Sequence, residues 1–99
     1  MNNWERMKAG RLYNADSKDL EKYHSFGMET CDKFNRTPLW MKKRKQRLLE
    51  KMIPSAKDGG AAIFAPFYCE YGVNIHFGKG CFVNYKCTFL DCAPITLED

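Results

Sequence analysis

The sequence contains no run of apolar residues close to the roughly 20 that are needed to cross a bilayer. Its first residues, MNNWERMKAG, lack the apolar segment that a secretory signal peptide requires. The five cysteines are odd in number and include no CxxC pair. We therefore expect a cytoplasmic protein, with no membrane association, no disulfide framework and no zinc-type metal site.

Charge is unevenly distributed along the chain. Residues 1–57 carry 14 Lys and Arg against 7 Asp and Glu, whereas residues 58–99 carry 2 against 5. Ninety-nine residues are enough for one domain, or for one domain with an appendage. We place a boundary at the change in charge, between a helical N-terminal domain at 1–57 and a second part at 58–99.

The N-terminal part has the capping and spacing patterns of helices. Asn2 or Asn3 can cap a short helix through WERMKA, which Gly10 would end. Ser17 would cap a second helix, and Asn35 would stop it. The apolar face of this second helix has spacings of three and four residues and comprises Leu20, Tyr23, His24, Gly27, Cys31 and Phe34.

A third helix is expected to begin at Thr37, with the following proline in its first turn, and to end at Pro54. It carries the basic run KKRK at Lys42–Lys45, which could bind nucleic acid phosphates or an acidic partner. The run contains no aromatic residue for base stacking, so we favour a solvated helix face and regard nucleic acid as an improbable partner. Trp4 and Trp40 are expected to cover a small core.

From Ile63 onward, apolar residues recur every six positions in two registers, and a third register that begins at Phe67 is mixed. The two apolar registers are Ile63, Cys69, Ile75, Cys81, Cys87 and Ala93, and Ala65, Tyr71, Phe77, Val83, Phe89 and Ile95. This period is typical of a parallel β-helix with three faces and about eighteen residues per coil. A narrow interior also accounts for the cysteines as small apolar residues.

The sequence therefore predicts an α+β protein, in which a short helical cap packs on the first coils of a β-helix. Residues 63–99 would form about two coils and end in mid-pattern at PITLED, whereas repeat folds need about three or more units. We expect a truncated solenoid. An interaction module that uses either the basic helix or the open end of the solenoid is the alternative function.

Three segments make the chain similar to the N-terminal half of the maltose/galactoside O-acetyltransferases of the hexapeptide-repeat superfamily. They are MKAGRLYNAD, CDKFNRTPLWMKKRKQRLLEKMI and, most specifically, FYCEYGVNIHFGKGCFVNYKCTFLDCAPITLED. The resemblance implies a left-handed β-helix under a helical cap and a homotrimer with active sites between neighbouring subunits. It also implies transfer of acetyl from acetyl-CoA to a sugar hydroxyl.

The resemblance further implies which residues bind the sugar acceptor. Asn84 matches the family's acceptor-contacting asparagine, and Asp91 matches an aspartate at the end of the following strand. Glu70 and Asp16 match further contact positions, although Asn14 competes with Asp16 for its place. For Asn84 and Asp91 the alternative is a structural role at corners, which both residue types tolerate.

The resemblance assigns the general base to a histidine that lies beyond Asp99, together with the coils that bind acetyl-CoA. His76 is expected to face outward on a coil, and His24 is expected to be packed against its neighbours. We therefore expect these 99 residues to contain no catalytic residue, to bind no acetyl-CoA by themselves and to be inactive alone.

Overall fold

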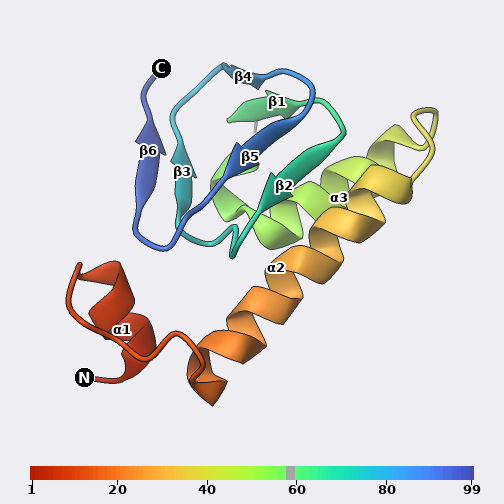
Figure 1. Cartoon of the computed structure of the whole chain (residues 1–99). Helices are drawn as coiled ribbons and strands as arrows, with labels where there is room; N and C mark the ends of the chain where they lie inside the picture. The colour runs from red at the N-terminus through yellow and green to blue at the C-terminus, as the bar shows by residue number, and fades with distance from the viewer. Residues whose placement is uncertain (58–59) are drawn as a thin grey trace.

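The computed structural model describes residues 1–57 and 60–99 (Figure 1). The helical elements are α1 (Asn3–Lys8), α2 (Lys18–Arg36), α3 (Lys42–Met52) and the 3-10 turn η1 (Pro54–Ala56). The strands are β1 (Ala61–Ile63), β2 (Phe67–Cys69), β3 (Ile75–Phe77), β4 (Cys81–Val83), β5 (Cys87–Phe89) and β6 (Ile95–Leu97). The domain boundary expected at residue 58 lies outside the described residues.

The strands form three parallel pairs, β1 with β4, β2 with β5, and β3 with β6. Each residue lies opposite the residue twenty positions later, as Ala61 lies opposite Cys81 and Phe67 opposite Cys87. The chain thus passes around three short sheets that enclose a common interior (Figure 1). The protein is α+β, with helices first and parallel strands after them, as expected.

The repeat is not a uniform six residues. Consecutive strands begin six residues apart except across the corners at 70–74 and 90–94, where the step is eight, so a coil takes twenty residues rather than eighteen. Each longer corner shifts the inward positions by two. Phe67, from the register predicted to be mixed, is therefore fully buried, whereas Ala93 is exposed. The prediction of a uniform six-residue period is therefore wrong at these two corners.

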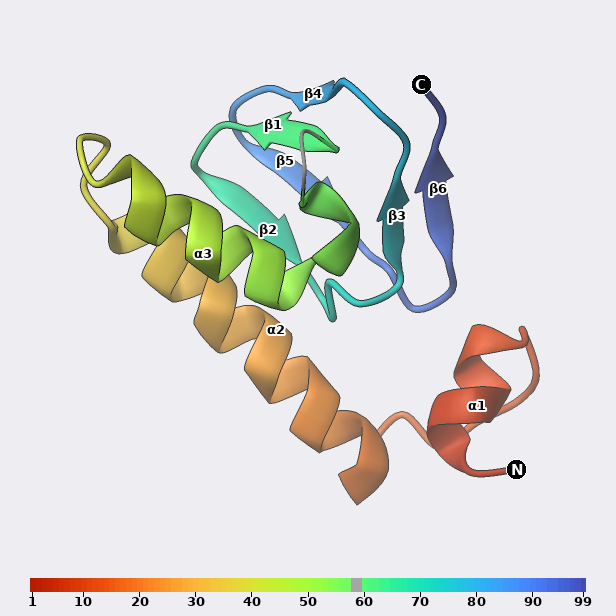
Figure 2. The ribbon, with the colours of Figure 1, turned by 180° about the vertical axis from the view of Figure 1, so that it is seen from behind.

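The helices and the strands share one apolar core. Helices α2 and α3 lie side by side against the first coil (Figure 2). Cys31 and Phe34 from α2 and Leu49 and Met52 from α3 pack in the same cluster as Phe67 of β2. The two compositional parts of the chain are therefore packed as one unit.

Two helices begin as predicted and the third does not. Asn2 is the N-cap of α1 and Ser17 that of α2. Thr37 ends α2 instead of beginning α3, because its N–H and its Oγ1 both donate to the carbonyl oxygen of Lys33. Helix α3 consequently begins later, at Lys42.

A second, smaller apolar cluster lies where α1 meets α2. Trp4 covers it as predicted, with its ring centroid 4.4 Å from that of Tyr23 and 5.0 Å from that of Tyr71. Trp40, the second predicted cover, is 79% exposed in the turn before α3, so that prediction is wrong. The buried members of the cluster are Met7, Leu20 and Tyr71.

The Asp19 carboxylate joins α1 to the start of α2. It accepts hydrogen bonds from Ser17 Oγ and, at 3.0 Å, from the backbone N–H of Trp4. These two bonds hold the pKa of Asp19 below its usual value of 3.8. A carboxyl group with a lowered pKa stabilises the folded state above its unfolded pKa, and this stabilisation is lost as the pH falls through the folded value.

We predict that α1 separates from α2 on acidification and that Asp19→Asn removes this response. In a Trp40→Phe background Trp4 is the sole tryptophan, so its fluorescence reports the junction directly. The emission should shift toward that of solvent-exposed tryptophan below about pH 4. Asp32→Asn, which alters an exposed carboxylate on α2, should leave the shift in place. An unchanged acid transition in Asp19→Asn would contradict the prediction.

Candidate functional site

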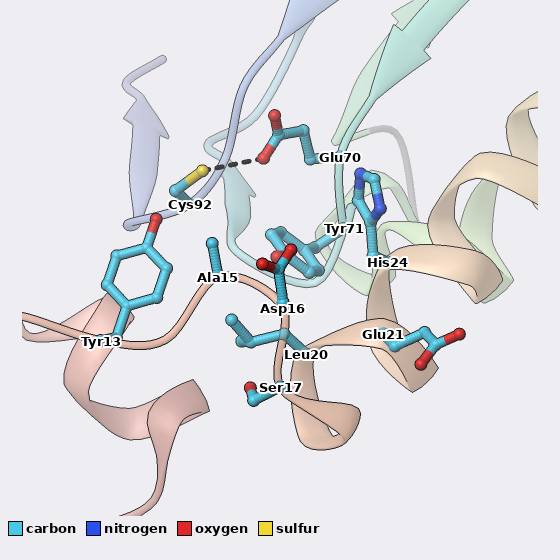
Figure 3. A pocket seen from close by; sticks show the side chains of 10 residues that line it. All are labelled: Tyr13, Ala15, Asp16, Ser17, Leu20, Glu21, His24, Glu70, Tyr71 and Cys92. Atoms are coloured by element: carbon cyan, nitrogen blue, oxygen red, sulfur yellow. Dashed lines mark hydrogen bonds between the residues drawn. The ribbon is translucent and has the colours of Figure 1, made fainter.

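A pocket of about 500 Å³ opens between the segment before α2, the first turns of α2 and the corners after β2 and β5 (Figure 3). These parts of the chain are far apart in sequence and are brought together by the packing of α1 and α2 on the strands. The pocket is lined by Tyr13, Ala15, Asp16, Ser17, Leu20, Glu21, His24, Glu70, Tyr71 and Cys92.

The structure brings two of the four predicted acceptor-binding residues together. Asp16 and Glu70 both line the pocket, whereas Asn14, the competitor of Asp16, does not. Asn14 Oδ1 instead accepts from the backbone N–H of Asp16 at 3.1 Å. Asn84 is exposed after β4 and does not line this pocket, and its Oδ1 accepts from the N–H of Tyr85.

Asp91 is fully buried beneath the pocket and does not line it. One oxygen of its carboxylate accepts from the N–H of Tyr71 at 2.9 Å, and the other from those of Gly72 at 2.7 Å and Asn74 at 3.2 Å. Asn74 Nδ2 also donates to the Asp91 carbonyl oxygen at 2.8 Å. This geometry favours the structural role at a corner, which the sequence left open as the alternative.

Gly72 makes the same corner possible. Its φ of +87° is in the left-handed region, where only glycine is free of a Cβ penalty. A Cβ at this position would also lie 2.7 Å from the carbonyl oxygen of Met52. The corner therefore needs glycine at position 72 and an acceptor such as Asp91 from the corner after β5, and together they fix the backbone of Glu70 and Tyr71 at the pocket wall.

Glu70 pairs with a residue that the sequence analysis did not assign to the site. The Cys92 thiol donates to Glu70 Oε2 at 2.8 Å (Figure 3). Burial and this bond raise the pKa of Cys92 to about 11, so the thiol is protonated at neutral pH. It therefore acts here as a hydrogen-bond donor that orients Glu70, and it is no thiolate nucleophile.

Three more lining side chains give the pocket its shape. The ring of His24 lies 5.4 Å from that of Tyr71, centroid to centroid, so His24 is packed as expected yet also faces the cavity. Burial raises the pKa of Tyr71 to about 12 and keeps its phenol neutral. Tyr13 completes the wall from the segment after α1. Cys92 could have been assigned to the site from the sequence if the coil had been taken as twenty residues long, because the corner after β5 then stacks on the corner after β2.

The lining side chains can both accept and donate hydrogen bonds. Asp16, Glu21 and Glu70 offer carboxylate oxygens that accept hydrogen bonds, and Tyr13 can donate one. Hydrogen bonds to carboxylates are about twice as strong as those between neutral groups. The Cys92 thiol and the Ser17 hydroxyl donate to the carboxylates of Glu70 and Asp19, and neither is paired with a histidine.

Other candidate sites carry less chemistry. His76 is exposed in the middle of β3, facing outward as expected. Among residues 1–57 and 60–99, no group of three or more His, Cys, Asp or Glu side chains could hold a metal ion. Within the same residues no helix has the length and apolarity needed to cross a membrane.

The basic run is only partly free to bind a partner. Lys45 Nζ donates to the carbonyl oxygens of Phe34 at 2.8 Å and Thr37 at 3.2 Å, and it lies 4.3 Å from the centroid of the Phe34 ring. Burial lowers the pKa of Lys45. Lys45 thus serves the C-terminal end of α2, and the other members of the run, Lys42–Arg44, are exposed.

Comparison with known proteins identifies the family. The model of the maltose acetyltransferase hexapeptide capping motif matches residues 6–57. Nodulation protein L of Rhizobium leguminosarum bv. viciae is 34% identical over 95 residues, which are 96% of this chain and 50% of that protein. The chain spans about half the length of the curated relatives that it matches.

Two solved structures share the fold over the whole chain. The maltose O-acetyltransferase from Clostridium difficile 630 has a TM-score of 0.92 at 30% identity, covering 100% of this chain and 52% of that one. The hexapeptide-repeat acetyltransferase from Vibrio cholerae O1 biovar eltor, complexed with acetyl coenzyme A, has a TM-score of 0.83 at 25% identity, covering 100% and 52%. The resemblance seen in the sequence is thereby confirmed, and the chain belongs to the maltose/galactoside O-acetyltransferase family, of which it represents an N-terminal portion.

Proposed function

We propose that these residues form the acceptor-binding part of an acetyl-CoA-dependent sugar O-acetyltransferase of the maltose/galactoside type. In this proposal the helices cap the first coils of a left-handed β-helix, and three copies associate so that neighbouring subunits complete each site. Asp16 and Glu70 bind the sugar directly, and Asp91 holds the corner that carries Glu70.

The observation that carries the proposal is the pocket shared by Asp16 and Glu70. They come from segments 54 residues apart and converge on one cavity, and the resemblance of the sequence matches both to acceptor contacts. The cavity is polar at the walls and has Leu20 and Tyr71 against it, which suits a sugar with hydroxyl edges and an apolar face. The two similar structures, a maltose O-acetyltransferase and an acetyl coenzyme A complex, support acetyl transfer to a sugar as the reaction.

We further propose that the 99 residues bind the acceptor without transferring acetyl. The resemblance assigns the general base to a histidine that neither His24 nor His76 matches. His76 faces away from the pocket, and His24 is packed on Tyr71. Acceptor binding and catalysis are thus separable in this chain, and each can be measured alone.

The test is a titration of the isotope-labelled 99-residue chain with maltose and with methyl galactoside, followed by NMR. We expect the amide signals of Asp16, Glu70 and Cys92 to move on binding. Glu70→Gln should raise the Kd about tenfold, because a hydrogen bond to a charged group contributes about 1.5 kcal/mol. Glu29→Gln changes an exposed carboxylate of α2 outside the pocket and should leave the Kd unchanged.

If the Glu70→Gln and Asp16→Asn variants bound the sugar as tightly as the native chain, the pocket would not be the acceptor site. Catalysis is tested by mass spectrometry of the sugar, since the five free cysteines of the chain would react with a thiol reagent. We expect no acetylated sugar from acetyl-CoA. Measurable turnover by the 99 residues would show that a general base is present within them.

A further inference from the structure

Three sulfur atoms meet in the core at a place that the proposed acceptor pocket does not use. Cys31 Sγ lies 3.4 Å from Met52 Sδ, Cys69 Sγ lies 3.5 Å from Met52 Sδ, and the two thiol sulfurs are 3.5 Å apart. The residues come from α2, the end of α3 and the end of β2, which converge at one side of the first coil (Figure 2). The three atoms form a nearly equilateral triangle, which we call the sulfur triangle.

The sulfur triangle is shielded from bulk water. The three side chains are 3%, 6% and 0% exposed, for Cys31, Cys69 and Met52 in that order. Its outer side is reached from a mainly apolar pocket of about 660 Å³, which both cysteines line together with Met28, Tyr68 and Leu90. Polar side chains, among them His24, Asp32 and Arg36, also line this pocket, and an ion can approach the two thiols from this side.

We propose that the sulfur triangle is a binding site for a soft monovalent metal ion, copper(I), with Cys31, Cys69 and Met52 as its three ligands. Thiolate and thioether sulfur are the ligands that select copper(I) over harder ions. Such a site cannot be recognised from the spacing of residues along the sequence, since its ligands lie in three different elements and one of them is a methionine.

The size of the sulfur triangle suits three-coordinate binding after a small adjustment. The centre of a triangle with sides of 3.5 Å lies about 2.0 Å from each corner, whereas metal–sulfur bonds are about 2.3 Å long. Each sulfur must then move outward by about 0.3 Å, a shift that a flexible methionine side chain and two cysteine rotamers can absorb.

The proton balance follows from the chemistry of the ligands. Cysteine binds a metal ion as the thiolate, so the Cys31 and Cys69 thiols each release a proton to solvent when copper(I) binds, while Met52 donates a neutral thioether lone pair. No electron is transferred, and the complex carries one net negative charge.

The other ordinary metal of cysteine sites is less well matched. Zinc takes four ligands in a tetrahedron, so it would need a fourth donor besides the three sulfur atoms. In the described part of the chain no third His, Cys, Asp or Glu joins the two thiols to form a metal-binding group. The sulfur triangle therefore discriminates by coordination number and by the softness of its ligands.

The test is an anaerobic titration of the reduced chain with copper(I), supplied as its bicinchoninate complex so that the loss of colour measures transfer to the protein. We expect one copper(I) per chain. Cys31→Ser and Cys69→Ser should each lower the affinity about a hundredfold, and Met52→Leu about tenfold, because each removes a soft ligand. Cys87→Ser and Cys92→Ser are matched controls that remove a thiol elsewhere and should leave the affinity unchanged.

Met52→Leu keeps the proposal testable even where a serine in the core unfolds the chain, because leucine conserves the buried volume. Folding of each variant is checked by circular dichroism. Copper(I) should also raise the Tm of the native chain and fail to raise that of Cys69→Ser, since an ion that binds the folded state stabilises it. Unchanged affinity in folded Met52→Leu and Cys31→Ser variants, or loss of binding in Cys92→Ser alone, would overturn the site.

Discussion

We expect Asp91→Ala to lower the free energy of unfolding by about 3 kcal/mol, because three buried backbone N–H groups lose their acceptor together. The carboxylate is fully buried, so water does not readily replace it without opening the corner. The loss is a large share of the 5–15 kcal/mol or so that stabilises a domain of ordinary size. Urea unfolding followed by circular dichroism measures it, provided that the slope with urea is unchanged.

Asp32→Ala is the matched control for this substitution. Asp32 is an aspartate of α2 whose partner, Arg36, is four residues away, and both side chains are largely exposed. An exposed ion pair contributes about 0.5 kcal/mol at most, so this variant should unfold close to the native midpoint. A loss below about 1 kcal/mol in Asp91→Ala would mean that the corner does not depend on its carboxylate.

The stability experiment also decides how a loss of sugar binding in an Asp91 variant is interpreted. Asp91 does not line the pocket, but its bonds to Tyr71 and Gly72 fix the chain next to Glu70. Sugar binding that disappears together with stability therefore reports the position of Glu70, and no direct contact between Asp91 and the sugar is needed. Glu70→Gln, which leaves the corner intact, isolates the contact itself.

Capping residues and glycines in the sequence correctly predicted the helix ends that are fixed by hydrogen bonds and backbone conformation within a few residues. Asn2 caps α1 through its own side chain, which accepts from the N–H of Glu5 at 2.8 Å, and Gly10 follows α1 with a φ of +74°. At Thr37 the same type of signal fails, because the residue satisfies α2 behind it instead of α3 ahead of it. A threonine before a proline is compatible with both roles, and packing decides between them.

The length of the corners could not be predicted from the six-residue period. The extra residues at 70–74 and 90–94 belong to two corners that are joined by hydrogen bonds, since the corner built around Gly72 is held by the Asp91 carboxylate of the other. That interaction links positions 19 residues apart, and a pattern of apolar residues contains no information about it. For the same reason, the assumed coil of eighteen residues did not assign Cys92 to the site, since Cys92 lies next to Glu70 only when the coil has twenty residues.

At the candidate site, only the residues that match the sequence pattern of a known family could be predicted. Asp16 and Glu70 were found by resemblance, and both face the pocket. The sulfur triangle was hidden because Cys31, Met52 and Cys69 look like separate core residues of two helices and a strand. A site whose residues come from three different elements can be recognised only once the packing of those elements is known.

We expect Gly27→Ala to lower the free energy of unfolding by about 2 kcal/mol, although alanine favours a helix by about 1 kcal/mol relative to glycine. Gly27 is buried where α2 crosses the corner after β2. A Cβ there would lie 2.5 Å from the carbonyl oxygen of Glu70 and 2.9 Å from Tyr71 Cα. Both are backbone atoms of the corner that Asp91 holds in place, so the helix must move away from the strands.

The comparison with Ser25→Ala separates this clash from helix propensity. Ser25 is exposed on the same helix two residues earlier, and its replacement should change stability by less than about 0.5 kcal/mol. Because residues of α2 and Glu70 both line the pocket, Gly27→Ala should also weaken sugar binding, while Ser25→Ala should not. If Gly27→Ala instead raised the urea midpoint, helix propensity would outweigh the close contact between α2 and the backbone of Glu70 and Tyr71.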